Sequence, residues 1–249
     1  MADVLKLTYN AFLRNWKMVS FFSLPFFLAF LIPLLAPTPT YLAAGASFLR
    51  TGSMYIDLTP IETAEIVASF VVSLFLVSFA VVSLNLVIKS ERTFTNIRKE
   101  VMEGIGKYVI TVFWLYLTAW VLMLIVHLAT YESEFAGILS PIAGFIISLP
   151  LFYAPTAMVI DEMRPAQALR ASVGTLGRQP VLFLLWLVIG IAAITAVDVL
   201  AIALAKTVNV PPAFSLVFPI IVLAANALVV LPFLIMMQAE TYLAKYTII

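Results

Sequence analysis

The sequence predicts an all-α, polytopic integral membrane protein with six transmembrane helices. Three observations lead to this fold class. Only 11% of the 249 residues are charged, whereas ordinary soluble domains are about 25% charged. Six apolar runs are each long enough to cross a hydrocarbon core of about 30 Å. Lysine and arginine are concentrated before the first run and in every second connection between runs.

The six apolar runs are the expected spans, and they cover residues 18–36, 66–88, 108–129, 135–160, 181–205 and 212–237. The segment before the first run is too polar and too long for the start of a signal peptide, and the run itself is longer than a signal-peptide core. We therefore expect it to be a retained helix. The connection 37–60 is long enough to hold a short surface helix or a cap.

The distribution of lysine and arginine predicts how the chain is oriented in the membrane. Twelve of these residues fall on one side of the expected spans and two fall on the other. The twelve are Lys6, Arg14, Lys17, Lys89, Arg92, Arg98, Lys99, Lys107, Arg164, Arg170, Arg178 and Lys245, against Arg50 and Lys206. Because basic loops remain in the cytoplasm, we expect both termini to be cytoplasmic.

Three basic segments show the spacing of amphipathic helices. In the segment 161–180, Leu169 and Val173 belong to an apolar stripe that lies opposite Arg170 and Arg178. Comparable stripes precede the first and third runs, and such segments are typical of helices that lie in the headgroup plane. Anionic headgroups are their expected partner. The expected lipid-contacting residues are Lys6, Arg14, Lys17, Arg98, Lys99, Lys107, Arg170 and Arg178.

Each amphipathic segment is followed by one run that leads out of the cytoplasm and one that leads back. The single membrane domain 1–249 therefore divides into three units, 1–90, 91–160 and 161–249, each a helical hairpin preceded by a cytoplasmic amphipathic helix. The units are candidates for parallel internal repeats. The alternative is that any loop beside an anionic membrane becomes basic and amphipathic, and the sequence leaves both explanations open.

Two stretches resemble a known family. In "YAPTAMVIDEMRPAQALRASVGTLGRQP" a proline-bearing helix leads to an A-L-R-x-S segment, and in "LPFLIMMQAETYLAKY" a proline-bearing last helix ends in T-Y-L. Together they resemble the membrane domain fused to some glycerophosphodiester phosphodiesterases and its stand-alone six-helix relatives of unknown function. The resemblance implies a six-helix layout with amphipathic connections. It implies no phosphodiesterase activity here, because the clustered His and Glu ligands of the soluble domain are absent from a chain with one histidine.

Three polar residues in the outer half of the runs, Glu65, His127 and Asp198, are candidates for an intramembrane site. An ionised Asp at a helix centre costs on the order of 3 kcal/mol, so we expect Asp198 to face the protein interior or water. If the three converge, they form a cation or proton site. Alternatively, Glu65 and His127 lie among headgroups, and Asp198 pairs with a neighbouring helix or is protonated. Glu240 is expected to meet water or Lys245.

Other chemistry is not indicated by the sequence. The absence of cysteine excludes disulfides, thiolate nucleophiles and cysteine metal sites. No Gly-rich phosphate loop, H-E-x-x-H or G-x-S-x-G motif occurs. We therefore expect no cofactor, no metal site and no catalytic residues. Nucleic acid is an unsuitable partner, because glutamates interrupt the basic segments and anionic lipid is nearer.

Two functions of different classes are compatible with these patterns. The first is a non-catalytic membrane protein that organises lipid or a partner protein through its cytoplasmic amphipathic helices. The alternative is a transporter or channel for a small solute, ion or lipid that uses Asp198, which the prolines within the runs favour. An intramembrane enzyme ranks third. The spacing of Ala192 and Ala196 allows close helix packing within the chain or in a homo-oligomer.

Overall fold

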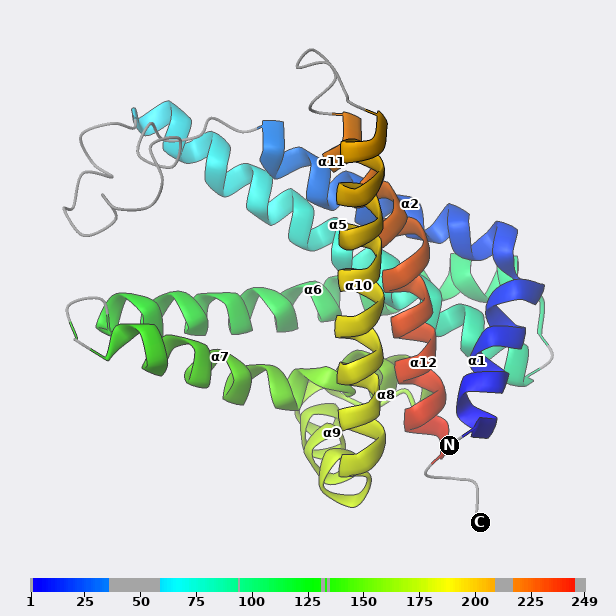
Figure 1. The fold of residues 1–249 in the computed structure, drawn as a ribbon. Helices are drawn as coiled ribbons and strands as arrows, with labels where there is room; N and C mark the ends of the chain where they lie inside the picture. The colour runs from blue at the N-terminus through cyan, green and yellow to red at the C-terminus, as the bar shows by residue number, and fades with distance from the viewer. Residues whose placement is uncertain are drawn as a thin grey trace.

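The computed structural model describes residues 2–35, 59–93, 95–130, 133, 135–208 and 217–244, and regular structure in this part of the chain is helical (Figure 1). The expected surface helix or cap in 37–60 lies almost entirely outside the described residues. The helices are α1 (Ala2–Arg14), α2 (Trp16–Leu35), α5 (Pro60–Thr93), α6 (Ile97–Thr130), α7 (Ala136–Phe152), α8 (Ala154–Ile160), α9 (Pro165–Arg178), α10 (Pro180–Val208), α11 (Val217–Ala225), η2 (Asn226–Val230) and α12 (Leu231–Leu243).

Six helical stretches in the described part of the chain are long and apolar enough to cross a membrane, and each overlaps one predicted run. They are Trp16–Leu34, Pro60–Thr93, Ile97–Thr130, Gly137–Ile160, Pro180–Leu204 and Pro219–Leu243. The predictions of an all-α chain and of six apolar helices are therefore confirmed. α5 and α6 have 34 residues each, or about 51 Å at 1.5 Å per residue, which exceeds the hydrocarbon core.

The expected amphipathic segments differ in how they join the spans. α1 ends one residue before α2, at the turn residue Asn15, and α9 ends just before Pro180 begins α10. Proline disfavours helical geometry at the residue before it, and Gln179 is accordingly non-helical. The segment before the third run is not a separate helix, because α6 runs without a break from Ile97 to Thr130. No proline interrupts it, so nothing forces the amphipathic part to end.

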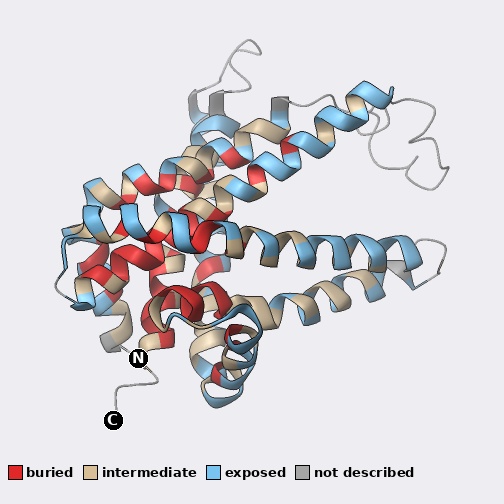
Figure 2. Ribbon diagram, turned by 180° about the vertical axis from the view of Figure 1, so that it is seen from behind, coloured by how far each residue is buried: buried red, intermediate tan, exposed pale blue. Residues whose placement is uncertain are grey.

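The buried core lies at one end of the molecule, where α5, α8 and α12 meet α1 and α2 (Figure 2). Every residue of 80–88 in α5 is buried, and so are all residues of 154–159 in α8. The largest fully buried side chains include Tyr153 and Tyr242. The other ends of the helices contribute little to this core, and in Figure 2 the distant parts of α6 and α7 are intermediate or exposed.

Three pairs of helices extend from this core, and we call them arms. α2 packs against α5, α6 packs against α7, and α10 packs against α11. In Figure 1 the three arms point in different directions, so their outer ends diverge. Burial reflects this arrangement. In the most apolar 18-residue segment of Pro60–Thr93, 61% of the residues are buried, whereas in that of Pro180–Leu204 only 6% are buried. α10 therefore leaves most of its apolar surface uncovered by the described chain.

Candidate functional site

The three candidate intramembrane residues lie on three different arms. Glu65 is exposed on α5, His127 is exposed on α6, and Asp198 is half-buried on α10. His127 Nδ1 is 3.3 Å from the Ser140 hydroxyl of α7, within its own arm. No hydrogen bond or ion pair between described residues joins any two of the three. Among the described residues there is also no cluster of three or more His, Cys, Asp or Glu side chains that would hold a metal ion.

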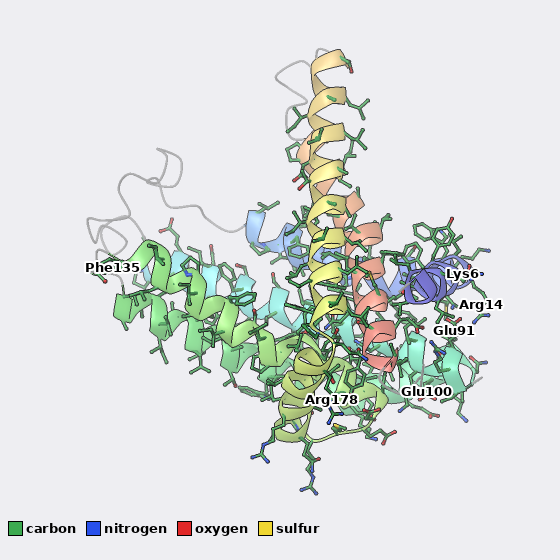
Figure 3. The ribbon with its side chains drawn as sticks, turned by 60° about the horizontal axis from the view of Figure 1, so that its bottom comes forward. Lys6, Arg14, Glu91, Glu100, Phe135 and Arg178 are labelled. Atoms are coloured by element: carbon green, nitrogen blue, oxygen red, sulfur yellow. The ribbon has the colours of Figure 1, made fainter. Side chains whose placement is uncertain are left out.

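The eight predicted lipid-contacting cations are all exposed. They come from four elements: Lys6 and Arg14 from α1, Lys17 from α2, Arg98, Lys99 and Lys107 from α6, and Arg170 and Arg178 from α9. Figure 3 shows that the labelled charged residues lie toward one end of the molecule, away from Phe135 at the tip of the α6–α7 arm. We call this region the charged end. It is also the end that holds the buried core.

Glu240 is a member of this region that sequence reasoning misplaced. It does not lie in water: the side chain is 5% exposed and forms an ion pair with Arg92. The expected alternative partner, Lys245, lies outside the described residues. The pair joins the last turn of α5 to α12 across 148 residues of sequence. The sequence offered one indication of this pair: Arg92 follows one long apolar run, and Glu240 lies near the end of another. A carboxylate in that position needs a cation beside it.

A second ion pair ties the first helix to the same end of α5. Arg14 of α1 donates to Glu91. The Asn15 amide donates to the other carboxylate oxygen of Glu91 at 2.9 Å and to the Ala11 carbonyl at 3.0 Å. Because Asn15 occupies the turn between α1 and α2, its side chain fixes both the turn and its distance from α5. The entry of the chain into the first span is thus positioned by α5.

Glu162 is held by two lysines of the charged end. Its two oxygens accept from Lys89 at 2.9 Å and from Lys107 at 2.7 Å. Hydrogen bonds from Lys107 and Lys89 lower the pKa of Glu162 to about 2. Its backbone has a φ of 54°, a left-handed conformation that costs a non-glycine residue roughly 1 kcal/mol or more. The two ion pairs therefore hold a turn in a conformation that glutamate alone would avoid.

Asp161, the residue before Glu162, connects this turn to α12. Tyr242 donates its hydroxyl to Asp161 at 2.6 Å, and Tyr153 donates to the Thr241 hydroxyl at 3.2 Å. Both tyrosine side chains are fully buried. Burial of a phenol is favourable only when its hydroxyl has a partner. The Tyr242 bond therefore ties the 161–164 connection to α12, and the Tyr153 bond ties the start of α8 to the same helix.

A serine of α9 is inserted into the break between α7 and α8. The Ser172 hydroxyl accepts from the Tyr153 backbone N–H at 3.0 Å and donates to the Leu149 carbonyl at 3.3 Å. In a continuous helix these two backbone groups would bond to each other. A side chain that enters the ladder in this way bends the helix. α9 is thus joined to the bend by one buried hydroxyl.

An apolar groove of about 620 Å³ lies between α6 and α7 and ends at α9. Its α6 wall includes Ile110, Trp114 and Leu122, its α7 wall includes Ile146 and Pro150, and its α9 end is formed by Pro165 and Leu169. Trp114 and Ile146 are 59% and 60% exposed, so the groove is open along one side. It belongs to two helices that are expected to lie in hydrocarbon. An occupant of this groove would be apolar.

Comparison with protein-family models, with curated proteins and with solved structures finds no significant match to this chain.

Proposed function

We propose that this chain is a non-catalytic integral membrane protein that organises lipid, or a partner protein, through basic amphipathic surfaces on the cytoplasmic side. The observation that carries the proposal is the set of cations left without an acidic partner. Among the described residues, the ion pairs of the charged end use Arg14, Lys89, Arg92, Lys99 and Lys107. Lys6, Lys17, Arg98, Arg164, Arg170 and Arg178 are exposed and form no ion pair with any described residue.

The burial pattern of α1 and α9 supports this assignment. In α9 the side facing the core is made of Ala168, Ser172 and Thr175, while Arg170 and Arg178 are exposed. In α1 the buried residues are Thr8, Ala11 and Phe12, and Lys6 and Arg14 are exposed. Exposed cations on helices at the membrane surface attract anionic headgroups. Each cation contributes about 1 kcal/mol to this attraction.

The proposal includes the finer topology. The three arms are hairpins whose charged end is cytoplasmic, so that both termini face the cytoplasm. The units 1–90, 91–160 and 161–249 correspond to the three arms and belong to one membrane domain. Kinship with the membrane domain associated with glycerophosphodiester phosphodiesterases is part of the same proposal and rests on the two sequence motifs.

The diverging arms are the second support. α10 exposes apolar side chains along most of its length, and in a bilayer lipid or another protein must cover them. Ala192 and Ala196 are exposed on α10 and line a shallow hollow with Thr195 and Val199. Small residues allow close approach of a second helix. This face is therefore where a partner, including a second copy, would pack.

Lipid analysis of native membrane particles tests the proposal. The protein is extracted with its surrounding lipid by a polymer, and the lipid composition is compared with that of the bulk membrane. Enrichment of anionic lipid is expected, and the variant Arg170→Gln/Arg178→Gln should reduce it severalfold. Gln167→Ala is the matched control, because it changes an exposed side chain of α9 without altering its charge. A lipid composition equal to the bulk membrane for the wild-type protein would overturn the proposal.

Asp198 keeps the transporter or channel as a second candidate. The residue lies within the span Pro180–Leu204 and forms no hydrogen bond or ion pair with another described residue. A carboxyl group in that position is costly unless it has a function or a partner. Flux of small ions and solutes into proteoliposomes tests this candidate. Loss of flux in Asp198→Asn, with the protein still folded, would favour it over the organising role.

A further inference from the structure

We infer that the groove between α6 and α7 binds one acyl chain of an anionic glycerophospholipid, whose phosphate lies against the cations at the α9 end. The inference rests on the proposed function and names the lipid and its site. Its starting point is the position of the groove on spans Ile97–Thr130 and Gly137–Ile160. The open side of such a groove faces hydrocarbon, where acyl chains are the apolar molecules at hand.

The dimensions of the groove fit one leaflet. Its α6 wall extends from Ile110 to Leu122, which corresponds to about 18 Å at 1.5 Å per residue. One leaflet contributes half of a hydrocarbon core of about 30 Å. An acyl chain that enters at the α9 end would therefore be in contact with the groove walls over about the depth of one leaflet. Apart from Thr111 and Thr118, the side chains that form the walls and the end are apolar.

The α9 end of the groove carries the positive charge. Pro165 and Leu169 line the groove, and each is adjacent in sequence to an exposed arginine, Arg164 or Arg170, that has no acidic partner among the described residues. Lys107 lies one turn of α6 before Ile110, so it belongs to the same end. Its ammonium group donates to Glu162 at 2.7 Å.

The local charge balance selects an anion. Glu162 is shared between Lys89 and Lys107, and Lys89 also lies 3.8 Å from Glu100, so the lysines are balanced by two carboxylates and the positive charge left over belongs to Arg164 and Arg170. Arginine pairs with phosphate through charge-assisted hydrogen bonds in bidentate geometry. A zwitterionic headgroup would bring its own cation to this positive region. The geometry therefore favours a headgroup with net negative charge, such as that of phosphatidylglycerol.

Fluorescence quenching by brominated lipid provides a direct test, because Trp114 lines the groove. The purified full chain in detergent is titrated with phosphatidylglycerol or phosphatidylcholine that carries bromine on its acyl chains. The signal of interest is the quenching lost in Trp114→Phe. We expect phosphatidylglycerol to quench Trp114 at about fivefold lower mole fraction than phosphatidylcholine, and the quenching to saturate at one lipid per chain.

Two variants separate the headgroup from the chain. Arg164→Gln/Arg170→Gln should reduce the preference for phosphatidylglycerol from about fivefold to near parity, whereas Arg98→Gln, which removes an exposed and unpaired cation outside the groove, should leave it unchanged. Ala119→Phe places a ring in the groove and should abolish the saturable quenching by both lipids. Unaltered circular dichroism and elution volume confirm that these variants are folded.

Several outcomes would overturn the inference. Equal quenching of Trp114 by both lipids in the wild-type protein, or quenching that persists in Ala119→Phe, would show ordinary contact with surrounding lipid. Absence of quenching together with a dimeric mass would assign the groove to a second copy. Either result leaves the enrichment of anionic lipid around α1 and α9 to be measured separately, so failure of the groove and failure of the proposed function are distinguishable.

Discussion

Arg92 donates a hydrogen bond to the buried carboxylate of Glu240, and this ion pair joins the end of α5 to α12. The two partners differ in exposure, since the Arg92 side chain is 47% exposed and that of Glu240 is 5% exposed. Removal of the arginine therefore leaves a charge that water reaches poorly. The buried carboxylate of Glu240 needs a cation beside it, so Arg92 offsets the cost of burying that charge. The pair is therefore not a source of net stability.

Arg92→Ala should lower the free energy of unfolding by about 2–3 kcal/mol, because an unpaired buried carboxylate remains. Equilibrium unfolding in mixed micelles measures the loss. The additional substitution Glu240→Gln should recover a large part of it, since the neutral amide is cheaper to bury. Arg98→Gln serves as the control for removal of a cation. A double variant less stable than Arg92→Ala would refute the account.

Glu162 predicts a pH dependence confined to acid. Its folded-state pKa is about 2, below the ordinary value of 4.5, so the unfolded chain binds more protons between these values. Stability from its two ion pairs is therefore complete above about pH 4.5 and is lost as the pH falls toward 2. Because the carboxylate is half exposed, solvent reduces the size of the effect.

Thermal unfolding between pH 2 and pH 6 checks this expectation. The wild-type protein should lose more of its melting temperature between pH 4.5 and pH 2 than Glu162→Gln does, and the two proteins should converge at the acid end. Glu103→Gln, which changes an exposed carboxylate of α6, should follow the wild-type curve. Parallel curves for the wild-type protein and Glu162→Gln would contradict the assignment.

Ser172→Ala should destabilise the bend between α7 and α8. The substitution leaves the buried N–H of Tyr153 without its acceptor and the Leu149 carbonyl without its donor, at about 1–3 kcal/mol. Ser148→Ala is a matched control, because that hydroxyl donates only to Phe145 of its own helix on an exposed face. Denaturant unfolding should separate the two variants, and equal stabilities would show that the Ser172 contacts are dispensable.

Substitution of two glycines of α6 by alanine should change the stability of the protein in opposite directions. A Cβ on Gly104 would lie 2.6 Å from Cδ2 of Leu86, a fully buried side chain, so Gly104→Ala should destabilise the packing of α5 on α6 by overpacking. A Cβ on Gly106 meets no atom within 4 Å. Gly106→Ala should therefore stabilise the helix by about 0.5–1 kcal/mol. Thermal unfolding of the pair is the measurement, and a shared sign would contradict the packing.

Trp186 predicts how α10 is held. Its indole N–H donates to the Leu234 carbonyl of α12 at 2.7 Å. Trp186→Phe removes this bond and should cost about 1 kcal/mol. Trp120→Phe is the control, since Trp120 stacks on Phe70 without a hydrogen bond between described residues. A cysteine introduced at Gly190, which is buried beside Leu234 of α12, should become more accessible in Trp186→Phe and not in Trp120→Phe. Equal accessibility in the two variants would count against this role.

The spans and the exposed cations could be predicted from the sequence because both depend on local composition. An apolar run needs about 20 residues and no partner, and Lys6 or Arg178 is placed by its neighbours in the chain. The prediction of a separate amphipathic helix before the third run is wrong, because α6 continues through this segment. Amphipathic spacing before Tyr108 does not itself end a helix. A proline does so, as Pro180 does between α9 and α10.

The network of the charged end could not be predicted, because its contacts are remote in sequence. Glu240 and Arg92 are 148 residues apart, and Tyr242 and Asp161 are 81 residues apart. Pro150 and Pro155 flank Tyr153 in the sequence, but the serine that bonds to the backbone of the bend belongs to another helix. Likewise, nothing in the pattern of six apolar runs indicates that the arms diverge.

The inserted hydroxyl of Ser172 also decides what kind of surface α9 presents. A helix that merely floats among headgroups detaches and returns without exposing buried backbone. Departure of α9 would strip both the Tyr153 N–H and the Leu149 carbonyl of their partner, at a cost of about 1–3 kcal/mol for each group. These bonds therefore favour an α9 that stays on the bend over one that moves as a flap, and the backbone that carries its arginines is held in place before anything is bound.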